Sequence, residues 1–312
     1  MTLQTKAVLL HATFSIPSGR KVDKAISDKV ADDYSVSGGR AQSGNFNKIA
    51  IAISYLRPFM DIKRTVEREI ESMTLPYLHE NDKMYILPNG KIMDFAKVWR
   101  KASSDWGSNI NELKMGKYNE AVDEARKRLN DQGGMFKETD YPDAEDFASK
   151  FKMEKFMRPI PDVHSMGFLT SLSQLEAEGI RKEMKESMEE SMETAKECLF
   201  SRIYKQMDEL RNILVGENPR IFEARMDGVK QLIESIKDLN FTDDERLEDI
   251  RTIMRDELYL DADQLRGDEV RQDEAIASAN KVIKKVGGCD IDGLSAYGEH
   301  DNVMEKIYGY RS

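Results

Sequence analysis

Apolar side chains recur at helical spacing over one long stretch in the C-terminal half of the chain. Between Ser171 and Val215 the main apolar row is Met184, Met188, Met192, Ala195, Leu199, Ile203, Met207, Leu210 and Leu214. The mean spacing of about 3.75 residues exceeds the 3.6 residues of an α-helical turn, which favours straight or slightly right-handed packing. We therefore expect one helix of about forty-five residues, and since a long helix needs a packed apolar face, we also expect partner helices.

The sequence that follows provides these partners. Apolar positions at helical spacing predict a helix that begins near Glu217–Pro219, a second after Thr242, and a third over Asp263–Val286 that ends at Gly287–Gly288. Thr242 and Glu245 match a capping box at the start of the second. We expect an elongated antiparallel bundle over residues 169–288, followed by a tail with a short helix over residues 289–312.

The N-terminal half combines strand and helix patterns. We predict a strand at Ala7–Ile16 and a short strand that ends in a turn at Tyr85–Gly90. Lys155–Pro161 is either an edge strand, which could pair with Ala7–Ile16, or an extended connection. We predict helices at Asp23–Tyr34, Asn45–Ser72 and Lys91–Asn130. Pro58 should kink or split the second helix, and Gly107 and Gly116 are candidate breaks in the third. Trp99 and Trp106 of the third helix are expected in the core. The fold class is mainly α: a helical N-terminal domain with a small β element over residues 1–168, then the long-helix bundle.

Charge is distributed unevenly along the chain. The net charge is -10; residues 1–160 hold 26 Lys and Arg against 23 Asp and Glu, or +3, whereas residues 161–312 hold 21 against 34, or -13. An acidic half repels phosphate, which argues against broad nucleic-acid binding. The two cysteines are far apart, and no apolar run reaches about eighteen residues. We expect a cytoplasmic protein that does not enter a membrane.

The sequence contains no recognisable catalytic motif, and we expect neither a cofactor nor a metal. Gly38-Gly39-Arg40 lacks the pattern of a phosphate loop, and the four histidines are solitary. Asp290, Asp292 and Glu299 match part of a calcium loop, but Gly288 replaces the aspartate expected at its first position. A turn rich in Asp and Gly gives the same sequence without a metal, and we expect that interpretation rather than calcium binding.

Two sets of residues are candidates for binding. Met184, Met188 and Met192 form a methionine row that either contacts a partner or packs within the bundle. Arg20, Lys21, Arg40 and Lys48 lie near the glycine-containing loop and are candidate contacts for phosphate or nucleic acid.

Six short motifs occur in order in the N-terminal half: Ser18-Gly19-Arg20-Lys21, Gly44-Asn45-Phe46-Asn47-Lys48, Thr74-Leu75-Pro76-Tyr77, Tyr85-Ile86-Leu87-Pro88, Asp140-Tyr141-Pro142 and Phe156-Met157-Arg158-Pro159-Ile160-Pro161. This order resembles a family of bacteriophage and bacterial proteins of uncharacterised function, often encoded beside MoxR-type AAA+ ATPases and von Willebrand A-domain proteins. The resemblance covers about residues 7–168. It implies a phage-encoded helical accessory protein, such as an adaptor for the ATPase, and it assigns no catalytic residue.

Three functional hypotheses follow. The first is a non-enzymatic adaptor that presents its long helices to a protein partner, an AAA+ ATPase or a second copy of itself. The alternative is a nucleic-acid-binding accessory protein that uses the four basic residues. The third is an enzyme whose site assembles from acidic residues distant in sequence. Salt separates the first two, because nucleic-acid affinity falls steeply with ionic strength and an apolar helix interface does not.

Overall fold

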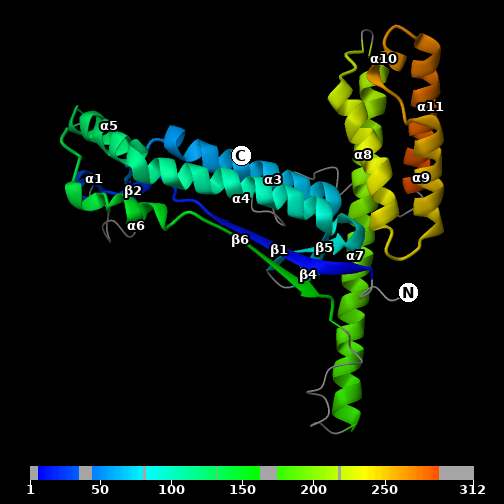
Figure 1. The fold of residues 1–312 in the computed structure, drawn as a ribbon, viewed down its shortest axis with the longest axis horizontal. Helices are drawn as coiled ribbons and strands as arrows, with labels where there is room; N and C mark the ends of the chain where they lie inside the picture. The colour runs from blue at the N-terminus through cyan, green and yellow to red at the C-terminus, as the bar shows by residue number, and fades with distance from the viewer. Residues whose placement is uncertain are drawn as a thin grey trace. The chain divides into compact units, whose positions relative to one another are not determined.

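The computed structural model describes residues 6–34, 44–79, 82–131, 133–161, 174–216 and 219–287, and its ribbon is drawn in Figure 1. Most of these residues are helical, and the strands form a four-stranded and a two-stranded sheet. The predicted mainly α fold with a small β element is therefore confirmed. The predicted C-terminal tail, residues 289–312, lies outside the described residues.

The chain divides into two compact units, each built from segments that are distant in the sequence. Unit 1 comprises residues 1–11, 70–95 and 156–312, and unit 2 comprises residues 12–69 and 96–155. This division differs from the sequential boundary expected near residue 168. Residues of the first strand and of the hairpin share one core with the long-helix bundle, and local periodicity cannot reveal such a contact.

The four-stranded sheet has the order β4-β5-β1-β6. β4 (Leu75–His79) and β5 (Asp82–Pro88) form an antiparallel hairpin, and β5 pairs antiparallel with β1 (Ala7–Ser15), where Leu9 faces Ile86. β6 (Lys152–Pro159) is the outer strand beside β1, so the predicted pairing of these two segments is confirmed. Both edge strands contain proline, which has no N–H for a further ladder.

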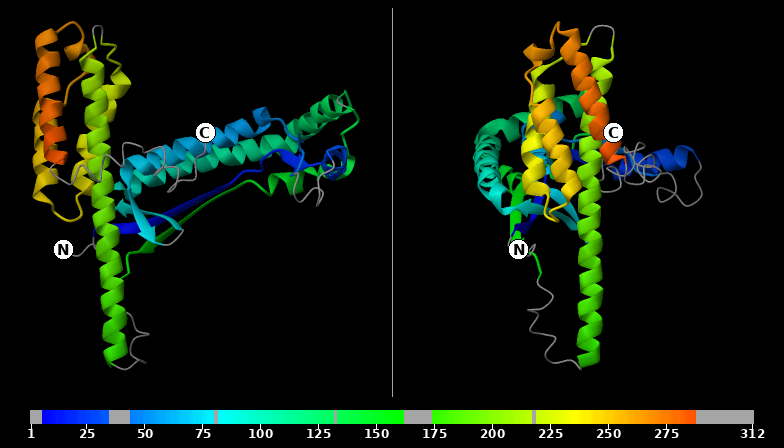
Figure 2. Two further views of the ribbon diagram at one scale, coloured as in Figure 1. Left: turned by 180° about the vertical axis from the view of Figure 1, so that it is seen from behind. Right: turned by 90° about the vertical axis from the view of Figure 1, so that its right-hand side faces the viewer.

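The bundle of unit 1 is organised around α7 (Gln174–Leu214), a helix of 41 residues. In Figures 1 and 2 its C-terminal part runs beside α8 (Glu223–Leu239), α9 (Glu245–Glu257) and α11 (Glu269–Val286). α11, β4 and α8 are the neighbours of α7, and one apolar cluster joins strand residues such as Leu9, Leu75 and Ile86 to the bundle. At Gly228 a Cβ atom would lie 2.9 Å from Nε2 of Gln206, so α7 and α8 pack closely there.

Two details of the predicted bundle are wrong. The helix expected over Asp263–Val286 is divided into α10 (Ala262–Leu265) and α11, because Gly267 between them adopts a φ of +74°. The capping box expected at Thr242 does not form. Asp244 caps α9 instead, and its carboxylate accepts a hydrogen bond from the Arg246 amide at 2.9 Å.

Unit 2 contains most of two long helices packed around aromatic side chains. Phe59 lies against Trp106, with ring centroids 5.0 Å apart in an edge-to-face arrangement, and against Phe151 at 4.2 Å. Trp99 and Trp106 are both buried, as predicted. Besides the ends of β1 and β6, this unit takes residues from β2 (Arg20–Val22), α1 (Lys24–Asp33), β3 (Asn47–Ile49), α3 (Ile53–Met73), α4 (Ile92–Glu112), a π-helical turn (Leu113–Lys117), α5 (Tyr118–Asp131) and α6 (Ala144–Ala148). Two 3-10 turns are Asn89–Lys91 in unit 1 and Glu138–Asp140 in unit 2.

Two helix boundaries in the N-terminal half differ from the prediction. α3 begins at Ile53 rather than Asn45, because β3 pairs with β2 and the carbonyl of Gly19 accepts hydrogen bonds from the amides of Ala50 and Ile51. Pro58 lies inside α3 without dividing it. The helix expected over Lys91–Asn130 is interrupted only at the π-helical turn, where Gly116 has a φ of +150°.

Candidate functional site

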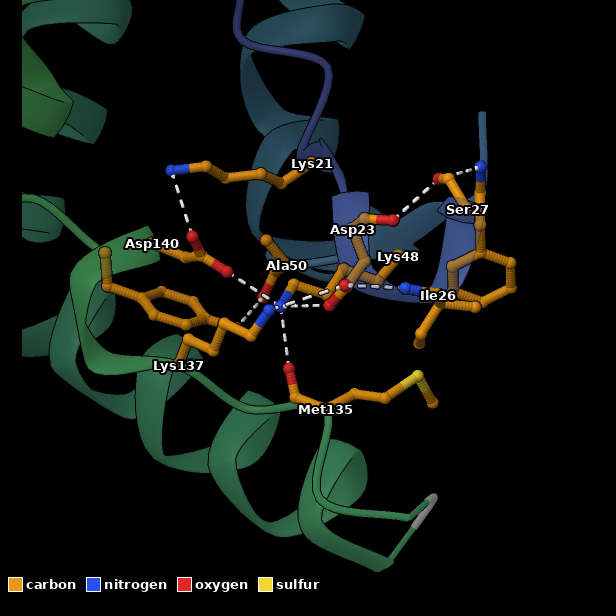
Figure 3. Close-up of polar contacts among 11 residues, drawn as sticks. Lys21, Asp23, Ile26, Ser27, Lys48, Ala50, Met135, Lys137 and Asp140 are labelled. Atoms are coloured by element: carbon orange, nitrogen blue, oxygen red, sulfur yellow. Dashed lines mark hydrogen bonds and ion pairs between the residues drawn. The ribbon is translucent and has the colours of Figure 1, made fainter. Parts of the chain in front are cut away.

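A buried lysine in unit 2 joins three segments that are distant in sequence. The side chain of Lys48, on β3, is 1% exposed; its Nζ lies 2.7 Å from Oδ2 of Asp140 and 3.2 Å from Oδ2 of Asp23 (Figure 3). It also donates a hydrogen bond to the carbonyl oxygen of Met135 at 2.7 Å. An ammonium group has three donors, so these three oxygens use its full capacity. We call Lys48, Asp23 and Asp140 the Lys48 cluster.

The local structure around the cluster holds both carboxylates in place. Asp23 is the N-cap of α1: its Oδ1 accepts a hydrogen bond from the Ile26 amide at 3.3 Å, and its carbonyl accepts one from the Ser27 hydroxyl at 2.6 Å. On the outer side, Lys137 lies 3.4 Å from Asp23 and Lys21 lies 3.3 Å from Asp140. Both outer lysines are about half exposed, so solvent screens their ion pairs.

Burial and ion pairing act in opposite directions on these groups. Burial alone raises the pKa of Asp23 and of Asp140. Hydrogen bonds from Lys48 to both carboxylates, from the Ile26 amide to Asp23 and from Lys21 to Asp140 outweigh this effect of burial and hold both pKa values below the ordinary range. Burial alone lowers the pKa of Lys48, yet the hydrogen bonds to Asp140 and Asp23 raise it above its ordinary value. All three groups are therefore charged at neutral pH.

This arrangement indicates that the Lys48 cluster stabilises the fold by joining three chain segments. A fully bonded ammonium with a raised pKa is neither a general base nor a nucleophile. Its three donors are all taken by protein oxygens, so this structure lends no support to the predicted phosphate contact at Lys48. Of the other predicted basic contacts, Lys21 pairs with Asp140, Arg20 is exposed on β2, and Arg40 lies outside the described residues. Of the three basic residues that the structure describes, Lys21 and Lys48 both pair with Asp140.

The cluster also explains three of the six short motifs by packing alone. Lys48 ends the motif that begins at Gly44, and Asp140 begins the motif Asp140-Tyr141-Pro142. Gly19 adopts a φ of +67°, and a Cβ atom there would lie 2.6 Å from the carbonyl oxygen of Ile51. These residues are required by the fold of unit 2, and sequence reasoning found Lys48 but missed its partners Asp23 and Asp140.

The second candidate region is the N-terminal part of α7, which we define as Gln174–Glu190. The buried row of α7 runs from Ser191 to Leu214, whereas between Ala177 and Ser191 no residue of the helix is buried. The same helical row continues into this part as Met188, Met184 and Ile180, all half-buried. The apolar row of α7 is therefore longer than its fully buried segment.

The structure divides the predicted methionine row. Met192 lines a small cavity beside Leu75 and Leu247, and Met188 also packs on the apolar cluster of unit 1. Met184 and Ile180 are not among the side chains that pack on this cluster. Burial within the bundle thus accounts for Met192, and Met184 remains the candidate for contact with a partner.

Charged side chains flank this row on both sides. At about 100° per residue, Glu183 and Glu190 lie on one flank of Met184 and Lys185 lies on the other. The far side carries Lys182, which pairs with Glu186 at 3.7 Å; both side chains are more than half exposed. The N-terminal part of α7 thus presents a narrow apolar row with acidic Glu183 and Glu190 on one edge and, on the other, Lys185, which pairs with Glu189 at 3.6 Å.

The remaining expectations concern metals, membranes and relatives. No group of three or more His, Cys, Asp or Glu in the described part of the chain could hold a metal ion, and Asp290, Asp292 and Glu299 lie outside that part. Among the residues described, no helix combines the length and apolar character needed to cross a membrane. The chain matches no family model, no curated protein and no solved structure.

Proposed function

We propose that this chain is a non-enzymatic helical adaptor that binds a protein partner through the N-terminal part of α7. One observation carries the proposal: between the buried residues Ser191 and Ala177, the apolar row of α7 consists of Met188, Met184 and Ile180, which are only partly buried. Helices gain most of their stability from packing of an apolar face. Met184 and Ile180, which are not among the side chains packed on the apolar cluster of unit 1, are thus the candidates for contact with another protein.

The flanking charges influence which partner surface fits this row. The acidic edge at Glu183 and Glu190 favours a partner that presents basic side chains on that side, whereas Lys185 on the other edge already pairs with Glu189. Methionine side chains adapt to irregular surfaces, which suits a helix that packs along the row.

The resemblance of the N-terminal half suggests which partner to test first. A family encoded beside MoxR-type AAA+ ATPases implies an accessory role to such an ATPase, and a phage origin follows from the same resemblance. We include a cytoplasmic location in this proposal. Nucleic-acid binding is the weaker hypothesis, because Lys48 is committed to an internal ion cluster.

The test is affinity capture with tagged protein at low and high salt. We compare the wild type with Ile180→Lys/Met184→Lys, and use Lys182→Gln/Glu186→Gln on the far side of α7 as the matched control. The proposal predicts that an AAA+ ATPase or a second copy of the chain is captured at both salt concentrations by the wild type and the control, and is lost in the lysine variant. Capture of the same protein by all three variants, or recovery of nucleic acid alone at low salt, would contradict it.

A further inference from the structure

A second feature of unit 1, separate from α7, is a hollow on the four-stranded sheet. It has a volume of about 240 Å³ and is lined by Leu9, Leu10, His11, Met84, Phe156 and Arg158. His11 on β1 faces Met84 on β5 in the antiparallel register. β6, which carries Phe156 and Arg158, is the next strand beside β1. The hollow thus lies over three adjacent strands.

Two rings form one part of the hollow. The imidazole of His11 and the ring of Phe156 are stacked, with centroids 6.3 Å apart and planes inclined by 23°. Phe156 is 50% exposed, which is high for a phenylalanine on a sheet. The exposed part of the Phe156 side chain is therefore a candidate surface on which a further flat ring could stack.

A cation lies beside these rings. Arg158 is two residues from Phe156, so both side chains leave the same face of β6, about 6.6 Å apart along the strand. No hydrogen bond or ion pair joins the Arg158 guanidinium to any other residue that the structure describes. No acidic side chain is among the lining residues of this hollow. The guanidinium therefore offers its planar set of donors to an anion.

We propose that this hollow binds a nucleotide unit, with the base stacked on Phe156 and the phosphate on Arg158. In a nucleotide, a flat base and a phosphate are separated by one sugar, and this spacing matches the separation of Phe156 and Arg158 along β6. Exposed aromatics on neighbouring strands, combined with arginine, recur where sheets bind unpaired bases. The same chemistry is offered by a free mononucleotide and by a nucleotide within a single strand, and the test distinguishes these sources.

The experiment is a titration of full-length protein labelled with 13C at the methionine methyl groups. Met84 lines the hollow and is the reporter; its signal is assigned with Met84→Leu. The probes are AMP, adenosine, ribose 5-phosphate and an eight-nucleotide oligo(dT). We expect AMP to shift the Met84 signal saturably, and adenosine and ribose 5-phosphate to bind at least tenfold more weakly, because each lacks one of the two contacts.

Substitutions assign the two contacts. Phe156→Leu and Arg158→Gln should each weaken AMP binding about tenfold, because base stacking and a charge-assisted hydrogen bond each contribute on this scale. Met157→Leu, on the opposite face of β6, should leave the affinity unchanged, and the other methionine signals verify that each variant is folded. Tighter, salt-sensitive binding of oligo(dT) assigns the site to single strands, and binding no tighter than that of AMP assigns it to free nucleotides. A Met84 signal that does not respond to AMP or the oligonucleotide, or that responds equally in both variants, would overturn the proposal.

Discussion

Replacing Lys48 with methionine removes the ammonium group and keeps a side chain of similar length. Asp23 and Asp140 then remain as neighbouring carboxylates, 2% and 15% exposed, without their shared central partner. Removal of one member of a buried ion pair costs about 3–5 kcal/mol, because the remaining charge is left uncompensated. Lys137 and Lys21 still contact the two carboxylates, so we expect the lower end, about 3 kcal/mol.

The two tryptophans make this effect measurable in the right part of the molecule. Trp99 and Trp106 are the only tryptophans of the chain, and both are buried in unit 2, which also contains the Lys48 cluster. Urea unfolding followed by tryptophan fluorescence therefore reports the stability of this unit. The matched control is Lys21→Met, whose pair with Asp140 is half exposed and should contribute less than about 1 kcal/mol.

A triple variant separates charge from shape. Asp23→Asn/Lys48→Met/Asp140→Asn removes the ion cluster as a whole, and asparagine at position 23 can still cap α1. We expect it to recover most of the stability lost in Lys48→Met, because neutral groups of similar size tolerate burial better than unpaired charges. A loss below about 1 kcal/mol in Lys48→Met, or a triple variant as unstable as the single one, would refute this reasoning.

Three further predictions concern pH and glycine. The pKa values of Asp23 and Asp140 lie below the ordinary 3.8, and that of Lys48 lies above the ordinary 10.5, so the contribution of these three groups to the stability of unit 2 is complete between those two pH values. This stability is lost as pH falls through the lowered pKa values of the carboxyl groups or rises through the raised pKa of Lys48. The free energy of unfolding of the triple variant in urea should therefore depend less on pH at both ends of the range. Gly19→Ala places an alanine at a φ of +67° and its Cβ 2.6 Å from the Ile51 carbonyl oxygen, so it should destabilise unit 2 by about 3 kcal/mol. Gly134→Ala, at a φ of +74° with no atom near the added Cβ, should cost only about 1–2 kcal/mol in the same fluorescence assay. Gly179→Ala lies inside α7 with no atom near the added Cβ and should stabilise the helix by about 0.5–1 kcal/mol, seen as slower amide exchange over residues 174–190. Gly228→Ala in α8 should give a smaller gain, because the added Cβ would lie 2.9 Å from the Gln206 side-chain amide, which has to move aside.

Periodicity predicted the elements that bury one continuous face. The long helix, its partner helices and the inward positions of Trp99 and Trp106 follow from apolar spacing, and all are present. The boundaries that differ depend on contacts distant in the sequence. α3 starts late because Lys48 and its neighbours pair with β2, and nothing within residues 45–52 reveals that pairing.

The candidate sites could be predicted only in part, for the same physical reason. A lysine in a sequence gives no sign of burial, so Lys48 could not be distinguished from a surface cation until Asp23, 25 residues away, and Asp140 were placed beside it. The hollow near Phe156 was likewise hidden, since His11, Met84 and Arg158 come from three different strands. The methionine row was visible in sequence, but only packing separates Met192 from Met184.

The central claim is that the N-terminal part of α7 contacts a protein partner, and site-specific photo-cross-linking tests it most directly. A photoreactive amino acid is placed at Met184 and, in a second protein, at Lys182, which lies about 160° around the helix. We predict one discrete protein adduct from position 184, formed at low and high salt, and little from position 182. Equal adducts from both positions, or none from position 184 while the partner is still captured, would contradict the claim.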